Sequence, residues 1–198
     1  MILQKVANSA VLPVGLADAR GHLRVDFDDD DLAINGLIRT AADYVQAVTR
    51  RSLITQSYRL CLECWPTERR VVLPVSPLVA ISAVTYYDAA NVQQTVDGAN
   101  WWPILREDSH GWLELKNGWT GPELFARSDA IAVEFTAGYG PTAATIPSAA
   151  RAAILLLIGH WYANREAAAS GVVPKQIEIG VEALLWTLWP GMVIGGDY

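Results

Sequence analysis

The feature that most constrains this sequence is a long apolar segment, Ile146–Ala169. Between Ala149 and Tyr162 its only strongly polar side chains are Arg151 and His160. Pro147 suits the first position of a helix, because its missing N–H would have no partner there anyway. A helix that is apolar on nearly every side is buried on nearly every side, and this strictly apolar part is shorter than the roughly 20 residues that span a bilayer. We therefore predict a buried core helix, with His160 as a hydrogen-bonded core histidine, around which the rest of the chain packs.

A second, amphipathic helix is predicted over Asp29–Arg50. A shorter helix, Gly15–Arg24, precedes it, and another, Gly180–Trp189, closes the chain. The apolar residues of the amphipathic helix recur at helical spacing and form one stripe, the natural partner of the core helix: Ile34, Leu37, Ile38, Ala41, Val45 and Val48.

An acidic run, Asp26-Phe27-Asp28-Asp29-Asp30-Asp31, separates the first two predicted helices. A calcium-binding EF-hand loop needs glycine at its sixth position and glutamate at its twelfth. Counted from Asp26, these positions hold Asp31 and Leu37, so the pattern fails. The favoured interpretation is that Asp28 caps the second helix and its neighbours interact with the positive end of the helix dipole.

The apolar pattern changes to a period of two between Ser52 and Thr136, as strands require. Turn-forming pairs such as Ser76-Pro77 and Asn117-Gly118 separate the runs. The predicted strands are Tyr58–Trp65, Arg70–Pro74, Ile81–Asp88, Trp102–Arg106, Gly111–Lys116 and Ala130–Thr136. We therefore predict an α+β fold: a small helical bundle of three to four helices with an inserted, mostly antiparallel β-subdomain. The expected division is an N-terminal helical part (1–51), the β-subdomain (52–137) and a C-terminal helical part with the closing helix and tail (138–198).

The amino-acid composition limits the classes of function that fit this chain. Charged residues make up 18% of the 198-residue chain, against about 25% in ordinary globular domains, and a chain with so few charges often covers part of its surface with other subunits. The net charge of -6 argues against a nucleic-acid-binding surface, which is basic. No secretory leader is recognised, so the expected location is intracellular, or inside an assembly built in a cytoplasm.

The sequence offers no active site, and we expect no catalytic, cofactor-binding or metal-binding residues. Cys61 and Cys64 have metal-like spacing, but residues three apart on a strand point to opposite faces. No second cysteine pair or histidine pair completes a zinc site, and nucleotide-binding and nucleophile-elbow motifs are absent. Two dibasic pairs, Arg50-Arg51 and Arg69-Arg70, are either solvated or face acidic neighbours in an assembly.

The eight tryptophans are the remaining unusual feature. Four tryptophans of the β-subdomain either fill its small core or, if exposed, bind sugars: Trp101, Trp102, Trp112 and Trp119. Trp186 and Trp189 differ, because they lie off the apolar stripe of the closing helix, which is Val181, Leu184, Leu185 and Leu188. A short helix with two apolar faces presents one to its own domain and the other to a partner.

Short motifs occur along the chain in a characteristic order. They are Leu23-Arg24-Val25 before the acidic run, Ala41–Val45, Thr49–Gln56, Leu73–Leu78, Val84–Asp88, Ala137–Gly140, Ile146-Pro147 and His160–Glu166. Together, from about Leu16 to Leu188, they resemble the head–tail connector (adaptor) proteins of long-tailed phages, which are also found in prophages and phage-derived gene transfer agents.

The resemblance implies a structural role without catalysis. Such a connector forms a ring under the portal, expected to be twelve-fold to match it, extends the DNA channel and joins capsid to tail. The implied partners are the portal protein, the adjacent tail-side connector (stopper) protein and other copies of the chain. DNA passes through without specific binding, and no membrane is involved. The implied location is the head–tail interface of the virion, after assembly in the bacterial host cytoplasm.

The expected partner-binding residues are Trp186, Trp189, Met192, Val193, Ile194, Arg50 and Arg51. The alternative function is a carbohydrate- or protein-binding module that uses the aromatic residues of the β-subdomain. An enzyme is the third possibility, since it would have to work without a recognisable nucleophile, base or metal site.

Overall fold

The computed structural model describes residues 1–6, 10–106, 109–164 and 175–189. The chain divides into a β-unit, made of Met1–Ser9 and Thr55–Gly138, and a helical unit, made of Ala10–Ile54 and Tyr139–Tyr198. The division expected from the sequence placed residues 1–51 together in a helical part. Instead, Ile2–Lys5 forms strand β1 and pairs with strand β2 (Gln56–Leu62) of the β-unit.

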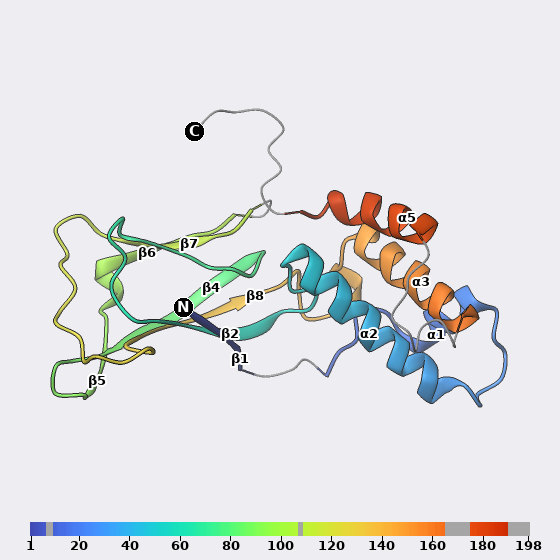
Figure 1. Ribbon diagram of the computed structural model, residues 1–198, viewed down its shortest axis with the longest axis horizontal. Coiled ribbons are helices and arrows are strands. Elements are labelled where there is room, and N and C mark those ends of the chain that lie inside the picture. Colours follow the sequence, from blue (N-terminus) through green and yellow to red (C-terminus); the bar gives the residue numbers. More distant parts are fainter. Residues whose placement is uncertain (7–9, 107–108, 165–174, 190–198) are drawn as a thin grey trace. The chain divides into compact units, whose positions relative to one another are not determined.

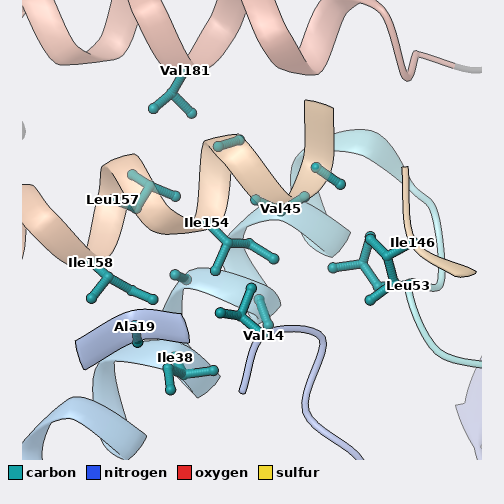
Figure 2. Close-up of a cluster of buried hydrophobic side chains, with 14 of the residues drawn as sticks. Val14, Ala19, Ile38, Val45, Leu53, Ile146, Ile154, Leu157, Ile158 and Val181 are labelled. Atoms are coloured by element: carbon teal, nitrogen blue, oxygen red, sulfur yellow. The ribbon is translucent and has the colours of Figure 1, made fainter. Parts of the chain in front are cut away.

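The helical unit contains four α-helices among its described residues: α1 (Leu16–Leu23), α2 (Asp31–Thr49), α3 (Ser148–Ala163) and α5 (Lys175–Trp186). A short 3₁₀ turn, Ala143–Thr145, precedes α3. The helices share one apolar core, in which Ile38 and Val45 of α2 gather with Ile154 and Leu157 of α3, and Val181 of α5 points toward α3 (Figure 2). The stripe expected on the second helix therefore faces the core helix as predicted.

Helix α3 is not buried on nearly every side, so that expectation is wrong for the described unit. Its inward residues Ile154, Leu157 and Ile158 are at most 1% exposed, but Leu156 is 43% exposed. The reason is that α3 packs against α1, α2 and α5, and these helices leave one side of it uncovered. His160 is buried and its ring Nδ1 lies 3.2 Å from the side-chain amide of Asn164, as expected of a hydrogen-bonded core histidine.

The expected cap at Asp28 is wrong. Asp30 occupies the N-cap position of α2, with no capping bond from its side chain. The Asp28 carboxylate instead accepts a hydrogen bond of 2.5 Å from the Arg20 guanidinium. An arginine fork is a stronger donor for a carboxylate than a single backbone N–H, so the acidic run is tied back to α1.

The β-unit holds two antiparallel sheets. The larger has the order β1-β2-β8-β4-β5, with β8 at Ile131–Ala137, β4 at Leu78–Tyr87 and β5 at Gln93–Thr95. The smaller has the order β3-β7-β6, with β3 at Arg70–Val72, β7 at Trp112–Leu115 and β6 at Trp101–Ile104; β6 and β7 are labelled in Figure 1. A 3₁₀ turn, Gly98–Asn100, leads into β6. Helices and two antiparallel sheets confirm the expected α+β fold.

The two sheets share a single apolar core. Leu60, Val133 and Phe135 of the larger sheet are buried with Leu113 and Leu115 of the smaller one. Strand β7 alternates half-buried and buried residues, and Val71 of β3 is buried between two exposed neighbours, the pattern of a sheet with one face on a core and one toward solvent. The inner face of the smaller sheet therefore closes the β-unit core.

The crossings between the units next to Ile54 and Gly138 lie at one end of the larger sheet. Gln56, the first residue of β2, is paired with Ala137, the last residue of β8. Lys5, the last residue of β1, is paired with Tyr58 close by. An insertion whose ends are neighbours in a sheet lets the chain leave and re-enter the helical unit at adjacent points.

We predict that Ile154→Ala lowers the free energy of unfolding by about 2–5 kcal/mol, because it opens a cavity in the helical core. Leu156→Ala on the same helix is the matched control, and we expect its effect to stay within about 0.5 kcal/mol, as for most surface changes. Denaturant titration followed by circular dichroism measures both. Equal losses for the two variants would contradict this assignment of the faces of α3.

Candidate partner-binding surface

Helix α5 presents two different faces. Val181, Leu185 and Leu188 follow the spacing of one helical face and are 2%, 2% and 6% exposed in the helical core. Trp186 and Trp189 are 51% and 47% exposed. The closing helix thus packs through the stripe expected from the sequence and leaves its tryptophans outward.

The two tryptophans form a pair. Their ring centroids are 6.0 Å apart and the rings are tilted by 45°. The α-helix ends at Trp186, three residues earlier than expected, and the chain continues in a turn in which the Trp189 N–H donates to the Trp186 carbonyl at 3.2 Å. Exposed Ile179 lies on the same side at helical spacing. This outward face, Ile179, Trp186 and Trp189, is the candidate partner-binding surface.

A buried arginine holds the end of α5 in place. The Nε of Arg51 donates to the Leu188 carbonyl, and its Nη1 donates to the Tyr139 hydroxyl at 2.9 Å. The guanidinium also lies over the Tyr139 ring, 5.7 Å from the centroid. Leu188 lies between the two exposed tryptophans in sequence, so Arg51 fixes the backbone that carries them.

The dibasic pair Arg50-Arg51 is split by the end of α2. Arg50 takes a left-handed conformation with φ of 55° and is exposed, whereas Arg51 is 6% exposed. The Arg51 N–H donates to the Thr49 hydroxyl at 3.3 Å. A direct contact of Arg51 with a partner, expected from the sequence, does not fit this burial, and we assign Arg51 a positioning role instead. Arg50 stays a proposed contact.

Three expected partner-binding residues, Met192, Val193 and Ile194, lie outside the described residues. Sequence reasoning missed the role of Arg51, whose acceptor at Leu188 is 137 positions away. Ile179 carried a usable signal, since it lies seven residues before Trp186 and therefore on the same helical face.

The two cysteines lie in different surroundings. Cys61 is buried on β2 and Cys64 is exposed beyond its end. Burial, with a smaller contribution from the nearby Asp129 carboxylate, raises the pKa of the Cys61 thiol and so keeps it protonated. No cluster of three potential metal ligands occurs among the described residues. None of the helices in the described ranges combines the length and the apolar content that a bilayer crossing requires.

The tryptophans of the β-unit are only partly in the core. Trp101 and Trp119 pack against the core, and Trp119 contacts the edge of Trp65 with centroids 4.9 Å apart. Trp102 and Trp112 lie on the outer side of the smaller sheet, where Lys116 and Arg70 lie over their rings at 4.7 and 4.5 Å. A sugar-binding site needs an open aromatic face, and cations lie over these two rings.

We predict that Arg51→Ala lowers the free energy of unfolding by about 1–3 kcal/mol, because it leaves the buried Leu188 carbonyl and Tyr139 hydroxyl without this donor. Hydrogen exchange of the backbone amides near the end of α5 should also become faster. Arg50→Ala is the control, with little change in either measurement. Normal protection of α5 in Arg51→Ala would contradict the positioning role.

Comparisons with known proteins agree with the resemblance found in the sequence. Residues 14–98 match the family model described as phage gp6-like head-tail connector protein. No curated protein sequence matches the chain.

Solved structures extend the likeness to the whole chain. A chain from the neck of an empty gene transfer agent (GTA) particle, computed with C6 symmetry, is 26% identical with a TM-score of 0.79, and 100% of each chain is covered. A chain from the virion of a native GTA particle is 25% identical with a TM-score of 0.80, covering 99% of both chains. A chain from the neck of a native GTA particle, computed with C12 symmetry, is 24% identical with a TM-score of 0.78 and shares the fold over 100% of both chains. The expected resemblance to head–tail connector proteins is confirmed.

Proposed function

We propose that this protein is a structural head–tail connector that forms a ring under the portal, extends the DNA channel and joins capsid to tail. The connector family model over residues 14–98 and the likeness to chains of GTA necks and virions support this role. The family is structural, and we propose no catalysis. The location that follows is the head–tail interface of a virion or GTA particle, after assembly in the host cytoplasm.

The observation that carries the role in this chain is the outward pair Trp186 and Trp189. Helix α5 already packs on the core through its other face. The two large exposed aromatic side chains are therefore available to contact a partner. Tryptophan is enriched at binding hot spots, where truncation costs roughly 2–4 kcal/mol or more. We propose that this face, with Arg50 and the apolar residues Met192, Val193 and Ile194, binds the portal or the adjacent tail-side (stopper) protein.

The proposed ring is twelve-fold, to match the portal. The C6 and C12 symmetries of the similar GTA necks are compatible with this number. Contacts between the sides of ring subunits are often too small to hold alone. A portal that binds one copy beside another raises their effective concentration, so we propose that the ring assembles on its partner.

We predict that the double variant Trp186→Ala with Trp189→Ala stays folded, with a nearly unchanged melting temperature, because both side chains are about half exposed. Its affinity for the portal or tail-side partner should fall by at least roughly 30-fold, since 1.4 kcal/mol is a factor of ten. Thermal unfolding and negative-stain microscopy of portal mixed with the variant measure the two properties.

The control for this experiment removes two other exposed aromatics, through Tyr44→Ala with Phe125→Ala. We expect this control to join the portal like the original protein. Loss of fold in the tryptophan variant would place the pair in the core, and normal assembly with normal stability would remove it from the interface. Failure of the unmodified protein to decorate any portal or tail component would contradict the connector role itself.

We predict that the protein binds duplex DNA more weakly than ordinary non-specific binders, whose dissociation constants are roughly 10⁻⁴–10⁻⁶ M at physiological salt. A conduit must let DNA slide, and a chain with a net charge of -6 offers little to hold phosphates. Gel retardation over a range of salt concentrations measures this. Retardation at low micromolar protein that is lost steeply with added salt would contradict it.

A further inference from the structure

The outer face of the smaller sheet is built from three neighbouring strands. Antiparallel pairing places Arg70, Glu114 and Trp102 in one row, and Val72, Trp112 and Ile104 in the next. Residues in one such row lie on the same side of a sheet. Figure 1 shows β6 and β7 running side by side in this sheet. Trp102 is 50% exposed and Val72 is 49% exposed, so the face meets solvent.

Cations cover the two tryptophan rings of this face. Trp112 has the Arg70 guanidinium 4.5 Å from its centroid and that of Arg106 at 5.7 Å. The Lys116 ammonium lies 4.7 Å above Trp102. Stacking on aromatic faces holds cations in place while part of each stays hydrated. We name this group the cationic sheet face: Arg70, Arg106, Lys116, Trp102 and Trp112.

The chemistry of the cationic sheet face favours a carboxylate-bearing segment with some apolar residues. Glu114, the acidic residue in its rows, accepts a hydrogen bond of 3.2 Å from the Trp112 indole N–H. Three cations therefore face one acid among the described residues, while Glu107 and Asp108, after Arg106, lie outside that description. The cations over both rings favour a ligand that carries negative charge, and the exposed part of Trp102 can take an apolar side chain.

The chain itself carries a segment of the matching chemistry. In Asp26–Leu32, Phe27 is 52% exposed and Leu32 is 88% exposed, and Asp26 and Asp29 are exposed beside them. We name this stretch the acidic segment.

The acidic segment is held in shape before any partner arrives. Arg20 binds Asp28 at 2.5 Å and lies 3.4 Å from Asp31, while the Tyr162 hydroxyl donates to Asp30. Fixing these three carboxylates holds the backbone that carries Asp26 and Asp29. A segment ordered in advance loses less conformational entropy on binding.

We propose that the acidic segment of one copy docks on the cationic sheet face of the next copy. This inference rests on the proposed ring, because a ring built by rotation joins two different surfaces of successive subunits. Asp26 and Asp29 meet the cations on the tryptophan rings, and Phe27 and Leu32 cover Trp102 and Val72. Opposite charges on the two faces fix the order of the subunits and disfavour like-to-like contacts.

Two charge-reversed variants test the contact. One reverses the sheet face through Arg70→Glu with Lys116→Glu, and the other reverses the segment through Asp26→Lys with Asp29→Lys. Each variant alone should fail to self-associate, because both of its faces then carry the same sign. An equal mixture should associate, since each variant then offers its partner the opposite sign at both contacts.

Sedimentation at submillimolar protein and low ionic strength, where charge contacts are least screened, provides the measurement. The unmodified protein should associate, and added salt should weaken the association of both the protein and the mixture. Matched controls change the net charge equally at exposed sites elsewhere: Lys5→Glu with Arg39→Glu, and Asp43→Lys with Glu63→Lys. Both controls should associate like the unmodified protein, and thermal unfolding checks that all variants are folded.

Results that differ from these expectations contradict the proposed contact between the acidic segment and the cationic sheet face. An unmodified protein that stays monomeric under these conditions, or a mixture that fails to associate, contradicts it. If only the sheet-face variant loses association, the cationic sheet face meets a different acidic surface of the neighbouring copy, and the acidic segment is not its partner. Decoration of portal by the unmodified protein tests the connector role separately, so the two can fail independently.

Discussion

The pairing of Gln56 with Ala137 is the constraint on which the rest of the fold depends. Helix α3 needs neighbours from both sides of the inserted strands, since Ile154 and Leu157 are buried by α2 and α5 together. A long insertion between α2 and α3 is compatible with that core only if its two ends meet. The larger sheet provides this because β2 begins beside the end of β8. A shift of that register would move the start of β2 away from the end of β8.

The sequence predicted the elements that carry a strong period and missed those that lack one. Helices α1, α2 and α3 and the strands with one buried face were expected near their observed positions. Strands β1 and β5 were missed because all of their residues are exposed. An edge strand with no inward face has no alternation to detect. The register between strands could not be predicted from the sequence pattern either, because it depends on partners far away in the chain.

The candidate surface was predictable for its tryptophans and not for its arginine. Counting residues on α5 separates Trp186 and Trp189 from Val181, Leu185 and Leu188, and burial in the structure follows the same division. Arg51 looked like half of a solvated basic pair. Its role depends on the hydrogen bond that it donates to the Leu188 carbonyl, and no pattern of side chains predicts a bond to a distant backbone acceptor. One of two adjacent arginines is therefore structural, and the turn at Arg50 decides which.

On the proposed function, contacts between copies have to be weak before the portal is present. A strong contact between two different surfaces would build open filaments or closed rings away from the head. Exposed charge pairs suit this need, since each contributes only about 0.2–1 kcal/mol and salt screens it. A tryptophan pair contributes several times more. On these proposals, the exposed aromatic pair on α5 supplies affinity for the partner. The cationic sheet face and the acidic segment then set the order of copies once that partner holds them side by side.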